Sequence, residues 1–69
     1  MKNRSLEAFH RDMKKYNVKP QEVAVKFPYA KHEGFQAFEC EYNDAVYYFC
    51  FNADNELIQS QLVSYPYKS

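Results

Sequence analysis

The sequence has a single glycine, no tryptophan, no net charge and no long apolar run. One glycine excludes the glycine-rich loops that wrap phosphate groups in nucleotide-binding proteins. The longest apolar run, residues 45 to 51, is far shorter than the roughly 20 residues that a membrane-spanning helix needs. Charged residues interrupt the N-terminal region, so no signal peptide is visible. We therefore expect no membrane partner.

What the chain has in quantity is aromatic residues, seven tyrosines and six phenylalanines among 69 residues. The hydrophobic share of 46% is too high for a disordered chain. A chain of this length buries only about 60% of its unfolded surface. The sequence therefore predicts one small domain over residues 1–69.

The first part of the chain has the period of an amphipathic helix. Apolar residues recur at spacings of three and four, and they are Leu6, Phe9, Met13 and Tyr16. Asn3 or Ser5 can cap the N-terminus, and Asn17 followed by Pro20 can end the helix. We expect a helix over about residues 4–17. Its opposite face is basic, with Arg4, Arg11, Lys14 and Lys15.

From residue 23 onward the apolar period changes from 3.6 to 2, which is typical of β-strands. The strands are predicted at about 23–30, 35–42, 45–51 and 56–65. Short polar turns join them, so the strands form an antiparallel meander. The predicted fold class is α+β, with the N-terminal helix packed on one face of this four-stranded sheet.

The turn at Asn43-Asp44 fixes the register of the second and third strands. A two-residue loop pairs Tyr42 with Ala45, Cys40 with Tyr47 and Phe38 with Phe49, which gathers the aromatic residues on one face. A four-residue first turn pairs Phe27 with Phe38 and sets Lys26 opposite Glu39.

The neutral charge consists of two opposed halves. Residues 1 to 32 carry eight Lys or Arg against three acids, a net charge of +5, and residues 33 to 69 carry one Lys against six acids, a net charge of −5. We expect the two halves to meet within the domain, partly through Lys26 and Glu39.

One helix covers one sheet face, and the other face is rich in apolar residues. Tails and long side chains can shade such a face, or another chain can pack on it. The second alternative is favoured, because aromatic and small residues match the composition of interfaces. The sequence therefore predicts a non-enzymatic protein-binding module that self-associates or binds and inhibits a target. The predicted interface is Phe35, Ala37, Val46, Tyr48, Cys50, Leu57, Val63 and Tyr65.

The chemically reactive residues form no site in this layout. Cys40 and Cys50 point to opposite faces, which excludes a disulfide between them and predicts free thiols in a cytoplasmic protein. His10 and His32 have neither the spacing of zinc ligands nor a cysteine nearby. We therefore expect no metal, no cofactor and no catalysis.

Two other functions remain open. The basic helix face can contact nucleic acid or an acidic partner, although the acidic second half opposes this. The richness in Lys, Asn, Tyr and Phe also suits a small protein of a phage or other mobile element that inhibits a host enzyme.

Residues 23–62, from Val-Ala-Val-Lys-Phe to Glu-Leu-Ile-Gln-Ser-Gln-Leu, contain two aromatic strands, a polar turn and a further strand. With the preceding helix and proline turn, this order resembles the PepSY type of small α+β domain. Residues 38–42 stand in place of its aromatic strand, and residues 52–58 in place of its Asp-Ala turn, without the usual Thr-Gly. The resemblance implies a domain that binds or inhibits proteins, often in an exported or membrane-linked setting.

Overall fold

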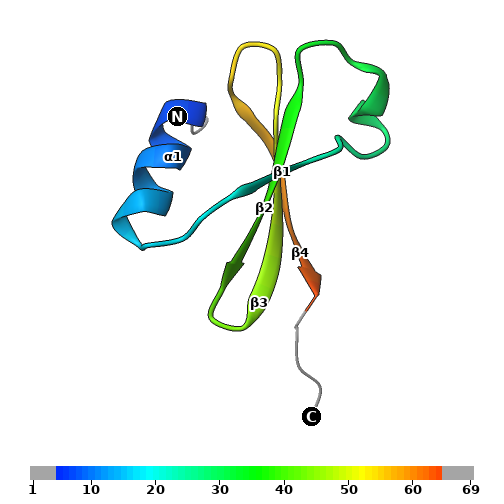
Figure 1. Cartoon of the computed structure of the whole chain (residues 1–69). Helices are drawn as coiled ribbons and strands as arrows, with labels where there is room; N and C mark the ends of the chain where they lie inside the picture. The colour runs from blue at the N-terminus through cyan, green and yellow to red at the C-terminus, as the bar shows by residue number, and fades with distance from the viewer. Residues whose placement is uncertain (1–4, 65–69) are drawn as a thin grey trace.

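The computed structural model describes residues 5–64 of the chain. The elements are α1 (Leu6–Lys15), β1 (Gln21–Val23), the 3₁₀ turn η1 (Tyr29–Lys31), β2 (Gln36–Tyr42), β3 (Ala45–Phe51) and β4 (Leu57–Ser64). The strands form one antiparallel sheet in the order β1-β2-β3-β4. Helix α1 lies on one face, and the loop that contains η1 lies on the other (Figure 1). The predicted α+β class is confirmed.

Helix α1 is held at both ends by the residues that the sequence suggested. The Ser5 side chain accepts a hydrogen bond from the backbone N–H of Ala8 at 3.1 Å, which caps the N-terminus. Lys14 and Lys15 lie in the last turn, where positive charge is favourable. Asn17 then adopts a left-handed conformation with φ of 60° and ends the helix. The helix is shorter than the predicted range 4–17.

The β2–β3 hairpin has the predicted register. Tyr42 pairs with Ala45, and the pairing continues through Cys40–Tyr47 and Phe38–Phe49. Asn43 and Asp44 both have positive φ, 54° and 62°, which suits the tight turn between twisted strands. The single glycine, Gly34, also has positive φ, as its place in a turn requires.

The predicted first strand, 23–30, is wrong. The strand that pairs with β2 is Gln21–Val23, and its Glu22 lies opposite Phe38, where Phe27 was expected. After Val23 the chain leaves the sheet, and Phe27, which precedes Pro28 through a cis peptide bond, is 87% exposed. Pro28 has no N–H to donate to a sheet, and the alternating residues before and after it instead pack across the second sheet face.

The sheet separates two small hydrophobic cores. The helix-side core consists of Phe9, Phe38, Cys40 and Phe51, with Leu6, Met13, Val18, Phe49 and Leu57 packed against it. The loop-side core consists of Ala37, Tyr48 and Cys50, with Val23, Val25, Tyr29, Phe35 and Ile58 packed against it. Both faces of the sheet are therefore covered in part by the chain itself. Within residues 5–64, no helix is both long and apolar enough to cross a membrane.

Candidate binding groove

The interface that the sequence predicted is not a single exposed surface in this fold. Ala37, Tyr48 and Cys50 are buried in the loop-side core, and Phe35 packs against them. Leu57 lies on the other side of the sheet, against the helix-side core. Val46 is half-buried and Val63 is exposed, while Tyr65 lies outside the described residues. The loop 24–35 takes the place that a partner was expected to occupy.

Tyr48 and Lys26 hold this loop on the sheet. The backbone N–H of Lys26 donates a hydrogen bond to the Tyr48 hydroxyl at 3.0 Å. The Lys26 ammonium lies 4.7 Å from the centroid of the Tyr48 ring and 3.5 Å from a carboxylate oxygen of Glu39. Lys26 and Glu39 therefore form the predicted pair, but Lys26 lies in a loop and not in a strand.

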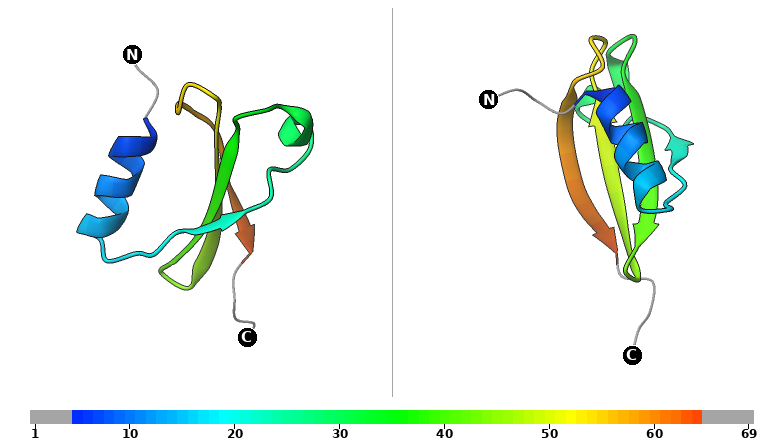
Figure 2. Two further views of the ribbon diagram at one scale, coloured as in Figure 1. Left: turned by 45° about the horizontal axis from the view of Figure 1, so that its top comes forward. Right: turned by 90° about the vertical axis from the view of Figure 1, so that its left-hand side faces the viewer.

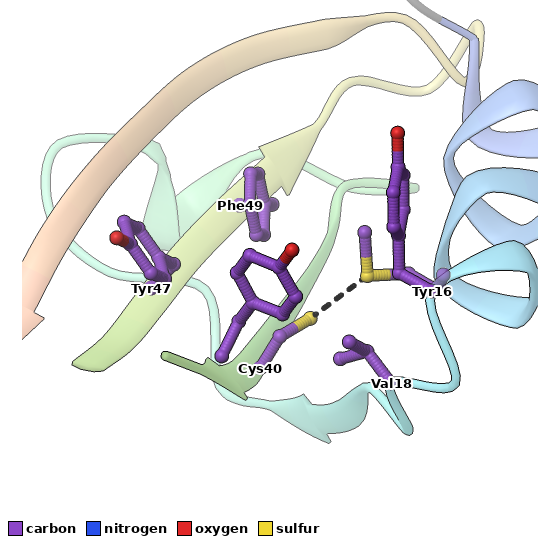
Figure 3. Close-up of a pocket in the computed structure, with 7 residues that line it drawn as sticks. Tyr16, Val18, Cys40, Tyr47 and Phe49 are labelled. Atoms are coloured by element: carbon purple, nitrogen blue, oxygen red, sulfur yellow. Dashed lines mark hydrogen bonds between the residues drawn. The ribbon is translucent and has the colours of Figure 1, made fainter. Parts of the chain in front are cut away.

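An apolar groove of about 400 Å³ lies between the C-terminal end of α1 and the β2–β3 hairpin. Tyr16 and Val18 line it on the helix side, and Tyr47 and Phe49 line it on the sheet side (Figure 3). Its full lining is Met13, Tyr16, Val18, Cys40, Tyr42, Tyr47 and Phe49. We call this set the tyrosine groove.

The groove exists because α1 is short compared with the strands beneath it. Ten helical residues span about 15 Å, whereas a seven-residue strand spans about 23 Å. The chain turns back after the helix, where the N–H of Val18 donates to the carbonyl of Met13 at 2.8 Å. This bond places Val18 beside the uncovered end of the sheet.

Two exposed tyrosines in contact with each other line the groove. The rings of Tyr16 and Tyr42 meet edge to face with centroids 6.1 Å apart, although one comes from the helix end and the other from β2. Both side chains are solvent-exposed, by 54% for Tyr16 and 44% for Tyr42. Such amphipathic rings at a hollow are typical of protein-binding surfaces.

The helix side of the groove has a cationic rim. A second, smaller hollow of about 270 Å³ shares Met13 and Val18 with the groove and is also lined by His10, Lys14 and Lys19. Of the basic residues that the sequence singled out, Arg11, Lys14 and Lys15 are exposed on α1, and Arg4 lies outside the described residues. The positive charge therefore lies beside an apolar hollow.

The floor of the groove contains an unreactive thiol. Cys40 Sγ donates to the Met13 Sδ at 3.6 Å (Figure 3), and burial raises the pKa of the Cys40 thiol to about 11. A thiol that stays protonated at neutral pH is a poor nucleophile. Cys50 lies in the other core, and both cysteines are free, as predicted. In residues 5–64, no three His, Cys, Asp or Glu side chains gather as metal ligands.

The buried thiols predict that the fold loses stability at alkaline pH. The unfolded Cys40 releases its proton near pH 9.0, whereas the folded thiol keeps it to about pH 11. This stabilisation is fully present below pH 9 and is lost as the pH rises toward 11. Burial also raises the pKa of Cys50 and of Tyr48, so both groups add to the loss of stability at alkaline pH. We expect the urea concentration at the unfolding midpoint to decrease as the pH is raised from about 8 to about 10.5.

The Cys40→Ala variant is the control for this pH effect, because it lacks one of the titrating groups. Its urea midpoint should start lower but fall less steeply with pH than that of the unmodified chain. If the urea midpoints of the two proteins decreased equally with pH, Cys40 would not contribute to the pH dependence of stability.

The sheet residues of the groove lie on the aromatic core face that the hairpin register predicted, but the opening beside the helix end was not predicted. The signal was the mismatch in length between the ten-residue helix and the longer β2–β3 hairpin, which carries Tyr42 and Tyr47 near its turn. Comparison of the chain with protein-family models, curated proteins and solved structures finds no match. The resemblance to PepSY domains stays a prediction.

Proposed function

We propose that the chain is a non-enzymatic protein-binding module whose tyrosine groove takes an apolar anchor side chain from an acidic segment of another protein. The observation that carries this proposal is the pair of exposed tyrosines, Tyr16 and Tyr42, at the mouth of an apolar hollow of about 400 Å³. A hollow of this size accommodates one leucine, phenylalanine or tryptophan side chain. We place this function in the cytoplasm, which the two free, buried cysteines support.

The shape and chemistry of the groove favour a side-chain anchor. Binding energy at protein interfaces concentrates in a few aromatic contacts that exclude water, and Tyr16 and Tyr42 are placed to make such contacts. Methionine at the base suits variable apolar partners, because its side chain is flexible.

The charges around the groove favour acidic residues next to the anchor. Lys14 and Lys19 line the adjoining hollow, so a partner segment that extends over it meets positive charge. The hairpin side ends in the exposed acid Asp44, which disfavours the reverse orientation of the segment. Charge complementarity of this kind sets orientation and association rate more than affinity.

The test uses phage-displayed random peptides of about twelve residues, selected on the folded chain. We expect the selected peptides to share an aromatic or leucine anchor flanked by Asp or Glu. Changing Tyr42→Lys should weaken the binding of a selected peptide by about tenfold or more, because one anchor contact is lost. Changing Lys14→Glu should weaken binding several-fold and reduce its dependence on salt.

The matched control is Phe27→Lys, which alters another exposed aromatic residue. Phe27 belongs to the loop 24–35, and the part of this loop that contains η1 lies on the opposite face of the sheet from α1 (Figure 1). Peptides that bind Tyr42→Lys as well as the unmodified chain would refute the proposal, and so would peptides that lose binding only with Phe27→Lys. Binding to duplex DNA that is lost with Lys14→Glu and kept with Tyr42→Lys would instead favour the basic helix face as the functional surface.

A further inference from the structure

Strand β4 forms one edge of the sheet, and within residues 5–64 it pairs only with β3 (Figure 2). Its eight residues, Leu-Ile-Gln-Ser-Gln-Leu-Val-Ser, include no charge and no proline. The opposite edge, β1, is three residues long and includes Glu22. Soluble proteins usually protect long sheet edges with charge, proline or a covering segment. By composition and length, β4 is the unprotected edge.

The part of β4 that is open for pairing is well defined. Ser5 forms an isolated bridge with Glu56, so the chain itself pairs next to the start of the strand. Register shifts against β3 occur near the two ends of β4, between Cys50 and Phe51 and between Val46 and Tyr47. Between these shifts, residues 59–62 pair regularly. A regular stretch of this kind is the part that can accept another strand.

We propose that a second copy of the chain pairs antiparallel with β4, centred on Gln61, so that the two sheets become one continuous sheet. Side chains on this edge are self-complementary in that register. Leu62 lies opposite Tyr47 in the sheet and is 44% exposed, while the small residue Ser60 lies opposite Phe49. Centred on Gln61, Leu62 of each copy lies opposite Ser60 of the other and covers the space beside Phe49.

The glutamines on the other face fit the same register. Gln61 meets its own copy, and within each chain Gln59 Nε2 already donates to Gln61 Oε1 at 2.8 Å. The chain has no net charge, so two copies approach without long-range repulsion. The absence of charge on the strand itself favours a second copy over a strongly charged partner.

Symmetry then determines where the grooves lie. Antiparallel strands related by a two-fold axis share their faces, so the axis is perpendicular to the sheet. Both copies of α1 and both tyrosine grooves lie on the same face of the joined sheet. The dimer goes beyond the proposed function, since it forms without a partner, and it makes the module bivalent.

The test is the solution mass of the full chain by sedimentation equilibrium, from about 5 to 500 µM. We expect the mass to rise toward twice the chain mass of 8.3 kDa. Gln61→Lys and Gln61→Glu should each stay monomeric, because like charges then face each other at the two-fold axis. An equimolar mixture of these two variants should recover the dimer, because lysine then faces glutamate.

The matched control is Glu33→Lys, a charge change at an exposed loop residue, which should leave dimer formation unchanged. Far-ultraviolet circular dichroism of each variant confirms that it is folded. A monomer at all concentrations refutes the inference, and so does a dimer that persists in Gln61→Lys. Folded Gln61 variants that stay monomeric when mixed also refute it. None of these readouts depends on a peptide in the groove, so failure of the dimer is distinguishable from failure of the proposed function.

Discussion

Replacing Tyr48 by alanine is expected to remove most of the stability of the domain. Tyr48 is completely buried in the loop-side core, and its hydroxyl accepts the N–H of Lys26. Removing a buried aromatic ring typically costs about 3 to 5 kcal/mol, and the total stability of a small domain is often about 5 kcal/mol. The measurement is urea denaturation followed by circular dichroism. Tyr48→Glu should be at least as damaging, because it also buries a charge.

Two tyrosine variants separate the reasons for this loss. Tyr48→Phe keeps the ring and removes only the acceptor for Lys26, so it should cost about 1 to 2 kcal/mol. Tyr42→Ala removes a tyrosine that is exposed at the groove, so it should cost less than about 1 kcal/mol. If Tyr48→Ala were as stable as Tyr42→Ala, the second sheet face would be open, and the interface predicted from sequence would regain its support.

The second sheet face, which the loop 24–35 covers, shows the limit of what sequence patterns predict. The hairpin register followed from a two-residue turn and from the gain in placing Phe38 and Phe49 on one face. Both are local constraints, so the hairpin register could be predicted from the sequence. The alternation of Val23, Val25 and Tyr29 was equally regular, but a loop can also direct alternate residues onto an apolar surface. Period alone does not distinguish a strand in the sheet from a segment that covers it.

Two observations in the sequence pointed to the covering segment. Pro28 interrupts the donors of the predicted strand, and the second face had more apolar residues than solvent tolerates. Together they indicated that something covers the face, and the nearest candidate was the chain itself. The tyrosine groove was harder to predict, since it depends on how far α1 extends along β2 and β3. Helix ends are placed from sequence only to within one or two residues, and α1 ends at Lys15, whereas the sequence predicted an end at about residue 17.

Phe9→Ala is the change expected to separate helix α1 from the sheet. Phe9 is 1% exposed, and its ring lies 5.0 Å from Phe49, 5.1 Å from Phe51 and 5.6 Å from Phe38, measured between centroids. No other side chain of α1 is buried. Losing it should cost about 3 to 5 kcal/mol, and a ten-residue helix is not stable alone in water. We therefore expect the helical circular dichroism signal to fall.

The groove provides the second readout of Phe9→Ala, because its helix side depends on the docking of α1. Tyr16 and Val18 follow the helix and contribute to the groove only while Phe9 holds it on the sheet. Peptide binding should therefore be lost with the helical signal at the same urea concentration. Tyr16→Ala is the matched control: it should weaken binding while leaving the helical signal and the urea midpoint nearly unchanged, since its ring is mostly in solvent. Binding that survives in Phe9→Ala after the helical signal is gone would place the binding surface on the sheet alone.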